Sequence, residues 1–187
     1  MNINETAFKD WHTDKYVTGL IKYYELLFLG LKSKPIKYLE IGIAHGESLQ
    51  WAKNYFSADS LIIGVDIREP DLLPNDSLFF NINQNDTNGL LALGEKYGPF
   101  DIIIDDASHV RKKTENTFNA LFKYRKPNGF YIIEDWGAGY LPQNGHCKGM
   151  EQLVVDLIWK YGGSITQKGP NPDNVDHIGY GNCAIIG

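Results

Sequence analysis

Short apolar runs alternate with amphipathic stretches along most of this chain. Between residues 14 and 31 the apolar positions recur at helical spacing, which predicts an amphipathic helix capped by Thr13 or Asp14, preceded by a polar leader at 1–13. From residue 36 on, short apolar runs predict buried strands, and the stretches between them predict helices. The expected strands are 36–41, 61–66, 78–81, 100–105 and 130–133, with two more near Ile165 and at 184–186, and the expected helices are 47–56, 89–96, 114–124 and 149–160.

Alternation of nearly unbroken apolar strands with helices is typical of a parallel sheet covered on both faces. We therefore predict an α/β fold, namely a Rossmann-like, doubly wound, mostly parallel sheet with helices on both faces and an antiparallel C-terminal strand. A length of 187 residues predicts a single domain, 1–187, with residues 36–187 as its Rossmann-like core. A polar loop at 68–76 and a turn at 126–129 interrupt the pattern.

The composition is that of an ordinary globular protein, with 43% hydrophobic and 22% charged residues. A formal charge of -5 and a pI near 5.5 argue against a nucleic-acid partner. The first residues lack the features of a signal peptide, and no apolar run approaches the roughly 20 residues of a membrane helix. Two cysteines make no disulfide framework. We expect a cytoplasmic protein that has no membrane partner.

Polar and acidic residues follow each of the five main predicted strands. Because ligands of open α/β sheets bind beyond the carboxyl ends of the strands, these positions form the candidate site. They are Glu40, Asp66, Gln84 to Asp86, Asp105 with Asp106, and Glu134 with Asp135.

The first strand ends in a glycine turn, Gly42-Ile43-Ala44-His45-Gly46, that opens a helix. Such a turn binds a nucleotide-like ligand, or it simply joins the strand to the helix. The middle glycine of the dinucleotide-binding pattern is missing, which is no handicap for S-adenosylmethionine, a cofactor without a pyrophosphate. Asp66 follows about 20 residues later, the spacing at which an acid accepts hydrogen bonds from a ribose, although it can equally be an ordinary acid at a strand end.

Four stretches carry a resemblance to a known family: Thr13-Asp14-Lys15 with Tyr24-Glu25; Leu39 to Ile43 with Gly46, Ser48, Leu49 and Trp51; Phe100 to His109; and Gly129 to Asp135. The chain resembles class I S-adenosylmethionine-dependent methyltransferases. More narrowly, it is similar to the group of metal-dependent macrolide sugar O-methyltransferases and cephalosporin hydroxylase-like proteins. Departures from the group's pattern are Gly19, where a His is common, Ala107, where Gly is usual, and the segment 83–86.

The resemblance implies a divalent cation, Mg²⁺ or another, held by Asp105, Glu134 and Asp135 at the ends of neighbouring strands. Carboxylate oxygens are the ligands that Mg²⁺ prefers. Asp106 would point to the other face of the sheet from Asp105, so we expect only one of the two as a ligand. Alternatively, these acids only cap strands or pair with the basic run at 111–113. The resemblance also implies that S-adenosylmethionine is bound by Glu40, Gly42, Gly46, Asp66, Gln84, Asp86 and Asp105.

His109 is the candidate general base, and Asp105 is the second expected catalytic residue. A neutral hydroxyl is a poor nucleophile, and a bound cation would lower its pKa so that an imidazole can take the proton. His109 could equally hold a backbone carbonyl or a metal-bound acid in place. His45, in the glycine turn, is more consistent with a structural role beside the cofactor.

We predict an S-adenosylmethionine-dependent O-methyltransferase that acts on a small hydroxylated, sugar-like acceptor with the help of Mg²⁺. One rival is a nicotinamide-dependent Rossmann oxidoreductase, and the other is a non-catalytic S-adenosylmethionine-binding protein. The missing middle glycine argues against the first, and the retained acids argue against the second. The segments that would cap the acceptor pocket are short, so the pocket is either open or completed by a second subunit in a homo-oligomer.

Overall fold

The computed structural model describes residues 13–140, 142–166 and 183–187. Most of the predicted polar leader, residues 1–12, therefore lies outside the described residues.

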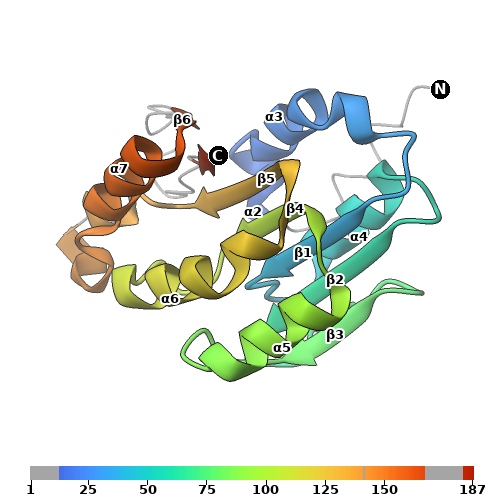
Figure 1. Ribbon diagram of the computed structural model, residues 1–187, viewed down its shortest axis with the longest axis horizontal. Helices are drawn as coiled ribbons and strands as arrows, with labels where there is room; N and C mark the ends of the chain where they lie inside the picture. Colours follow the sequence, from blue (N-terminus) through green and yellow to red (C-terminus); the bar gives the residue numbers. More distant parts are fainter. Residues whose placement is uncertain (1–12, 141, 167–182) are drawn as a thin grey trace.

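In these ranges seven strands form one sheet, in the order β3-β2-β1-β4-β5-β7-β6 (Figure 1). The first five in this order are parallel, and β7 is antiparallel to both β5 and β6. The strand order reverses between β1 and β4, the position at which open α/β sheets bind their ligands. The predicted sheet is thus confirmed. Its strands are β1 (Lys37–Ile41), β2 (Leu61–Asp66), β3 (Leu78–Asn81), β4 (Phe100–Asp105), β5 (Arg125–Glu134), β6 (Gly163–Thr166) and β7 (Cys183–Ile186).

Helices cover both faces of the sheet (Figure 1). One core cluster joins α5, α6 and α7 to strand residues such as Leu39, Ile103 and Ile133, and a second joins α3 and α4 to Tyr38 and Ile104. Because successive strand residues point to opposite faces, the central strands contribute to both clusters. None of the helices in the described ranges is long and apolar enough to cross a membrane. The helices are α2 (Asp14–Val17), α3 (Leu20–Leu27), α4 (Glu47–Tyr55), α5 (Thr87–Tyr97), α6 (Arg111–Leu121) and α7 (Met150–Tyr161), with short 3-10 turns at Leu29–Leu31, Phe122–Tyr124, Ala138–Tyr140 and Pro142–Cys147.

The single helix predicted for residues 14–31 is wrong. The chain forms α2, a break at Thr18 and Gly19, then α3 and a 3-10 turn. Gly19 has a φ of 76°, a left-handed conformation that glycine adopts at little cost. The helical spacing of apolar residues continues across the break, because both pieces pack on the same face of the sheet.

The turn predicted at 126–129 is also wrong, because these residues belong to β5. Their pairing with β4 is irregular between Phe100 and Ile102, which accounts for the turn-like sequence.

Two helices begin nearer to the N-terminus than predicted. Asp86 caps α5 by accepting a hydrogen bond from the N–H of Gly89 at 2.9 Å, and α6 begins at Arg111.

Candidate functional site

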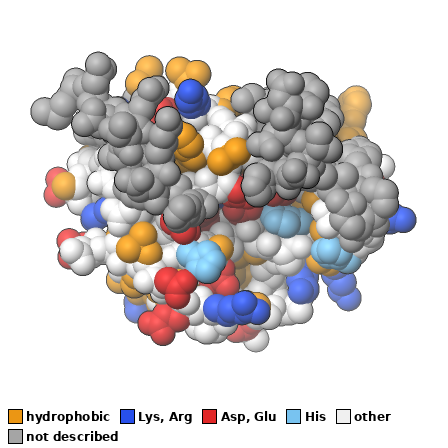
Figure 2. Space-filling view, turned by 180° about the vertical axis from the view of Figure 1, so that it is seen from behind, with side chains coloured by type: hydrophobic (Ala, Val, Ile, Leu, Met, Phe, Trp, Pro, Cys, Tyr) orange, Lys and Arg blue, Asp and Glu red, His pale blue; other side chains and the backbone are white. Residues whose placement is uncertain are grey.

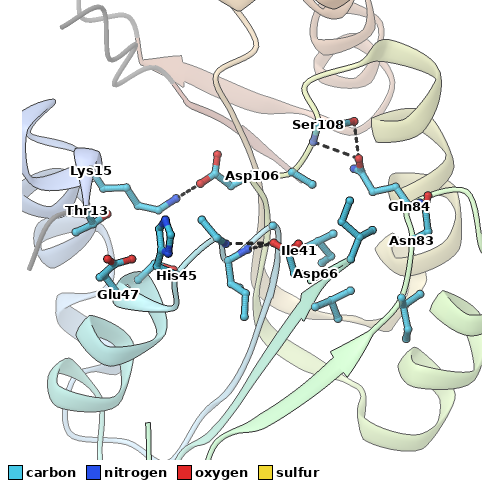
Figure 3. Close-up of a pocket in the computed structure, with 18 of the residues that line it drawn as sticks. Thr13, Lys15, Ile41, His45, Glu47, Asp66, Asn83, Gln84, Asp106 and Ser108 are labelled. Atoms are coloured by element: carbon cyan, nitrogen blue, oxygen red, sulfur yellow. Dashed lines mark hydrogen bonds and ion pairs between the residues drawn. The ribbon is translucent and has the colours of Figure 1, made fainter. Parts of the chain in front are cut away.

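A cavity of about 460 Å³ opens at the carboxyl ends of the parallel strands, a size within the usual range of small-molecule sites. Lys15 of α2 and His45 of the glycine turn lie at one end of it (Figure 3). Gln84 and Ser108, from the loops after β3 and β4, lie at the other end, with Asp66 between the two. The cavity therefore collects the polar ends of the central strands.

The turn after β1 is left-handed at three residues, with φ of 86° at Gly42, 45° at Ala44 and 96° at Gly46. A Cβ atom at Gly42 would overlap the backbone of Asp106, and one at Gly46 would overlap the carbonyl oxygen of Leu72. Both glycines are required by φ and by space. Gly42 lines the cavity, whereas Gly46 lets the loop after β2 close against the turn.

Asp66 holds this turn in shape. Its Oδ2 accepts hydrogen bonds from the N–H groups of Ile43 and Ala44, at 3.0 and 3.1 Å (Figure 3). Its Oδ1 accepts one from the N–H of Arg68 at 3.2 Å. Asp66 lines the cavity, and it also occupies two turn N–H groups that a pyrophosphate would need.

Gln84 lines the cavity with all of its side-chain polar atoms engaged. Its Nε2 donates to Oδ1 of Asp105 at 3.0 Å and to Oγ1 of Thr117 at 3.1 Å. Its Oε1 accepts from the hydroxyl of Ser108 at 2.6 Å and from the Ser108 N–H at 3.2 Å. Gln84 thus holds the loop after β4 in place. Asp86, a predicted cofactor residue, is exposed at the α5 cap and is not among the residues that line the cavity.

Asp105 lies on the opposite face of the sheet from the other acids. It is 2% exposed, and the structure places it with Gln84 and Thr117 rather than in the cavity lining or with Glu134 and Asp135. Burial raises its pKa to about 8. The structure therefore corrects the expectation that Asp105 contacts a metal, the cofactor or the reacting groups. Asp106, the next residue, takes the position that the sequence predicts for Asp105.

The acids that do converge form two overlapping groups. The inner group is Glu40, Asp106 and Glu134, and the outer group is Asp106, His109 and Asp135. Within each group the candidate ligand atoms lie within 4.8 Å of one another. Asp106 belongs to both groups and lines the cavity, so the acidic cluster opens onto the cavity.

The inner group is buried and holds the ammonium group of Lys15. Lys15 Nζ lies 2.7 Å from both carboxylate oxygens of Glu134 and 3.4 Å from Oε1 of Glu40, and it donates a short hydrogen bond to Asp106. Burial alone would lower the pKa of Lys15, but the charges of Asp106, Glu134 and Glu40 outweigh it, so the pKa is raised and the amine stays protonated. The hydroxyl of Tyr24 also donates to Glu134, at 2.9 Å.

The outer group is only partly buried. His109 and Asp135 both have positive φ, 52° and 51°, conformations that cost free energy in non-glycine residues and are enriched at functional sites. His109 Nε2 lies 3.9 Å from Oδ1 of Asp106. Burial, and then the charge of Asp106, raise the pKa of Asp135 to about 8. On the face seen in Figure 2, histidine side chains lie beside acidic ones.

Comparisons with known proteins identify relatives of the chain, although no model of a protein family matches it. The demethylmacrocin O-methyltransferase of Streptomyces fradiae is 35% identical over 131 residues, 66% of this chain and 33% of the relative. The 8-demethyl-8-(2-methoxy-alpha-L-rhamnosyl)-tetracenomycin-C 3'-O-methyltransferase of Streptomyces olivaceus is 36% identical over 130 residues, 65% of this chain and 33% of the relative.

Among solved structures, the MycE methyltransferase of the mycinamycin biosynthetic pathway, in complex with Mg, SAH and mycinamycin VI, superposes with a TM-score of 0.74. The match is 27% identical and covers 97% of this chain and 53% of that one. The chain has the class I methyltransferase fold. Its homologues are macrolide and sugar O-methyltransferases. This methyltransferase homologue spans about a third of the length of the curated relatives it matches and about half of MycE.

Sequence reasoning missed two residues of this site. The sequence favours Asp105 over Asp106 as the ligand and assigns no role to Lys15. The strand register carries the signal for Asp106, because Asp105 pairs with Ile41 and Ile133 and shares their face. That signal is absent from a single sequence.

Proposed function

We propose that this protein is an S-adenosylmethionine-dependent O-methyltransferase that acts on a small hydroxylated, sugar-like acceptor with the help of Mg²⁺. The observation that carries the proposal is the double position of Asp106. This residue lines a cavity of cofactor size and belongs to both groups of potential metal ligands. A methyl donor and a cation-bound hydroxyl would therefore be held next to each other.

The glycine turn supports S-adenosylmethionine rather than a dinucleotide. A dinucleotide-binding turn offers its free N–H groups to a pyrophosphate, whereas two N–H groups of this turn already donate to Asp66. Asp66 lies between the two ends of the cavity, where its carboxylate would meet a ribose (Figure 3). Gly42 and Gln84 complete the cofactor wall on either side of Asp66.

The acidic cluster fits a hard divalent cation. Asp106 and Asp135 present carboxylates on the partly buried side of the cluster. Glu134 belongs to the inner group together with Asp106, and Lys15 contacts both of them. These three carboxylates are the proposed metal ligands. When bound, a divalent cation lowers the pKa of an acceptor hydroxyl, and S-adenosylmethionine supplies an electrophilic methyl group.

His109 is the proposed general base. Mg²⁺ prefers oxygen ligands, so the imidazole of the outer group is left to accept a proton at Nε2. Its positive φ turns it towards Asp106, and the hydrogen bonds from Gln84 to the preceding Ser108 hold this loop in place. The rest of the rate enhancement would come from positioning the two reactants in line.

The remaining assignments are part of the same proposal. We place the enzyme in the cytoplasm, with a small-molecule acceptor, no nucleic acid and no membrane partner. The names of the relatives suggest an acceptor panel of demethylmacrocin, mycinamycin VI and rhamnosyl tetracenomycin. We also propose a homo-oligomer in which a second copy completes the acceptor pocket.

Isothermal titration with S-adenosylhomocysteine and, separately, with NADH tests the cofactor. We expect micromolar binding of the first and none of the second. Methyl transfer from labelled S-adenosylmethionine to the acceptor panel, with and without EDTA, then tests the reaction and the cation. The absence of binding heat at millimolar S-adenosylhomocysteine would contradict the cofactor assignment. Turnover that is unchanged by EDTA would contradict the role of the metal ion.

A further inference from the structure

Lys15 occupies a place in the acidic cluster that is built like a cation site. Its ammonium group contacts all three members of the inner group, Glu40, Asp106 and Glu134. Its side chain is almost completely buried and reaches the cluster from α2, which belongs to the wall of the cavity. No other lysine or arginine of the described residues forms an ion pair with these acids.

The inner group is held in shape by groups other than Lys15. The hydroxyl of Tyr24 donates to Glu134 at 2.9 Å, and that of Tyr38 donates to Oε2 of Glu40 at 2.8 Å. The second oxygen of Glu40, Oε1, is fully buried and lies 3.4 Å from Lys15 Nζ, farther than the 2.7 Å between Lys15 Nζ and Glu134.

The dimensions of the inner group suit a divalent ion. Its three ligand oxygens lie within 4.8 Å of one another, and oxygens on opposite sides of an octahedral Mg²⁺ are about 4.2 Å apart. The outer group shares Asp106 with it. Two metal ions that share a carboxylate usually lie about 3.5–4 Å apart, so the two groups together have the layout of a two-cation site.

We propose that Lys15 is a built-in second cation. Its ammonium group fills the inner group, which would otherwise bind a divalent ion, so that the protein binds one divalent ion, at the outer group and the adjoining oxygens of Glu134. The inference rests on the proposed metal use of the outer group. A covalently attached cation keeps Glu40 and Glu134 neutralised whether or not the metal is bound, and it ties α2 to the wall of the cavity.

Counting bound Mn²⁺ per full-length chain by electron paramagnetic resonance tests the proposal, with Mn²⁺ alone as the probe. Wild type should bind one ion. Lys15→Ala, which removes the charge and leaves room for the ion and its water, should bind two. Lys15→Arg, which keeps the charge, should bind one, as should Lys112→Ala, which removes an exposed lysine outside the cluster.

The added ion is located by a double variant. Glu40 belongs to the inner group alone, so Lys15→Ala combined with Glu40→Gln should return the count to one. Thermal unfolding gives a second readout, because removing Lys15 leaves buried carboxylates without a counter-ion. The melting temperature of Lys15→Ala should fall without Mn²⁺ and recover by at least half of the loss with it, whereas Lys15→Arg should gain no more from Mn²⁺ than wild type does.

Two results would overturn the proposal. One is a Lys15→Ala protein whose Mn²⁺ count equals that of Lys15→Arg. The other is a Lys15→Ala protein that stays unfolded at saturating Mn²⁺. A wild-type protein that binds no Mn²⁺ would instead contradict the proposed metal at the outer group, and the difference between the two Lys15 variants would still decide the role of Lys15.

Discussion

Asp105 and Asp106 are neighbours in the chain and belong to two different polar regions. Asp105 lies in a buried network with Gln84 and Thr117, on the face of the sheet that α5, α6 and α7 cover. Asp106 lies in a cluster of charges with Lys15, Glu134, Asp135 and His109, on the side to which α2 contributes. We call the first the neutral region, because hydrogen bonds hold it together, and the second the charged region, because it contains the ion pairs of Lys15.

Because of this difference, the Asp105 region can hold the loop after β4 in place, whereas the Asp106 region can take part in the reaction. In the Asp105 region the amide of Gln84 has a partner for every polar atom, so the region can fix the loop after β4 but offers little to a ligand. In the Asp106 region carboxylates outnumber the single lysine, so a further cation is favoured there. Because Asp105 and Asp106 are consecutive residues, the first region can position the second.

Substitution of each aspartate by asparagine should separate the two regions most strongly. Asp106→Asn should lower kcat/KM for Mg²⁺-dependent methyl transfer by roughly 100-fold or more, because it removes a carboxylate shared by both ligand groups. Asp105→Asn should change it by less than about threefold, because burial already favours the neutral form of Asp105 at neutral pH. Equal losses in the two variants would mean that the regions do not differ in this way.

The side chain of His109 tests whether the charged region carries out chemistry. His109→Gln should lower kcat by roughly 100-fold to 10,000-fold, the usual contribution of a general base, with little change in the affinity for S-adenosylhomocysteine. The matched control is His146→Gln, at an exposed histidine. A loss of less than tenfold, with an unchanged pH profile of kcat, would assign His109 a positioning role only.

The neutral region should respond in stability rather than in chemistry. Gln84→Met keeps the size of the side chain and removes its hydrogen bonds to Asp105, Thr117 and Ser108. We expect the free energy of unfolding to fall by about 1–3 kcal/mol, because buried polar groups lose their partners. Asn88→Ala, at an exposed amide on α5, is the control for urea denaturation. An unfolding free energy like that of the control would contradict the holding role.

The pH dependence of stability tests both regions at once. Burial raises the pKa of Asp105 and Asp135 to about 8 in the folded state, above the ordinary value of 3.8. The folded state therefore binds their protons more tightly, and this stability is lost as pH rises towards 8. Between pH 6 and pH 8 the free energy of unfolding should fall by on the order of 2 kcal/mol per group.

Mg²⁺ should separate these two contributions. A bound cation replaces the proton on Asp135, so only the Asp135 part of the pH dependence should disappear when Mg²⁺ is added. The Asp105 part should remain with Mg²⁺ present and disappear in Asp105→Asn. Urea denaturation of wild type and of Asp105→Asn at pH 6 and pH 8, with and without Mg²⁺, measures the change in unfolding free energy between the two pH values under each of the four conditions. A pH dependence that Mg²⁺ abolishes entirely would place Asp105 in the metal site after all.

Local sequence predicted much of this molecule. The bounds of β2, β3 and β4 agree with the prediction, because an apolar run bounded by polar residues is a local property. The glycine turn was also predicted, since its two glycines adopt the positive φ that a tight turn requires, which is a local demand. The break at Gly19 was missed, because the apolar spacing continues across it and only the backbone shows the interruption.

By itself, then, the sequence determined most of the strands and helices and the set of acids at the strand ends. The tertiary structure decided which acids meet. Strand register sets the face to which each acid points, and register depends on pairing between β1, β4 and β5, which are far apart in the chain. Lys15 shows the same limit, because its partners Asp106 and Glu134 lie 91 and 119 residues away. Burying one lysine among three carboxylates is a property of the packed fold, and no local pattern encodes it.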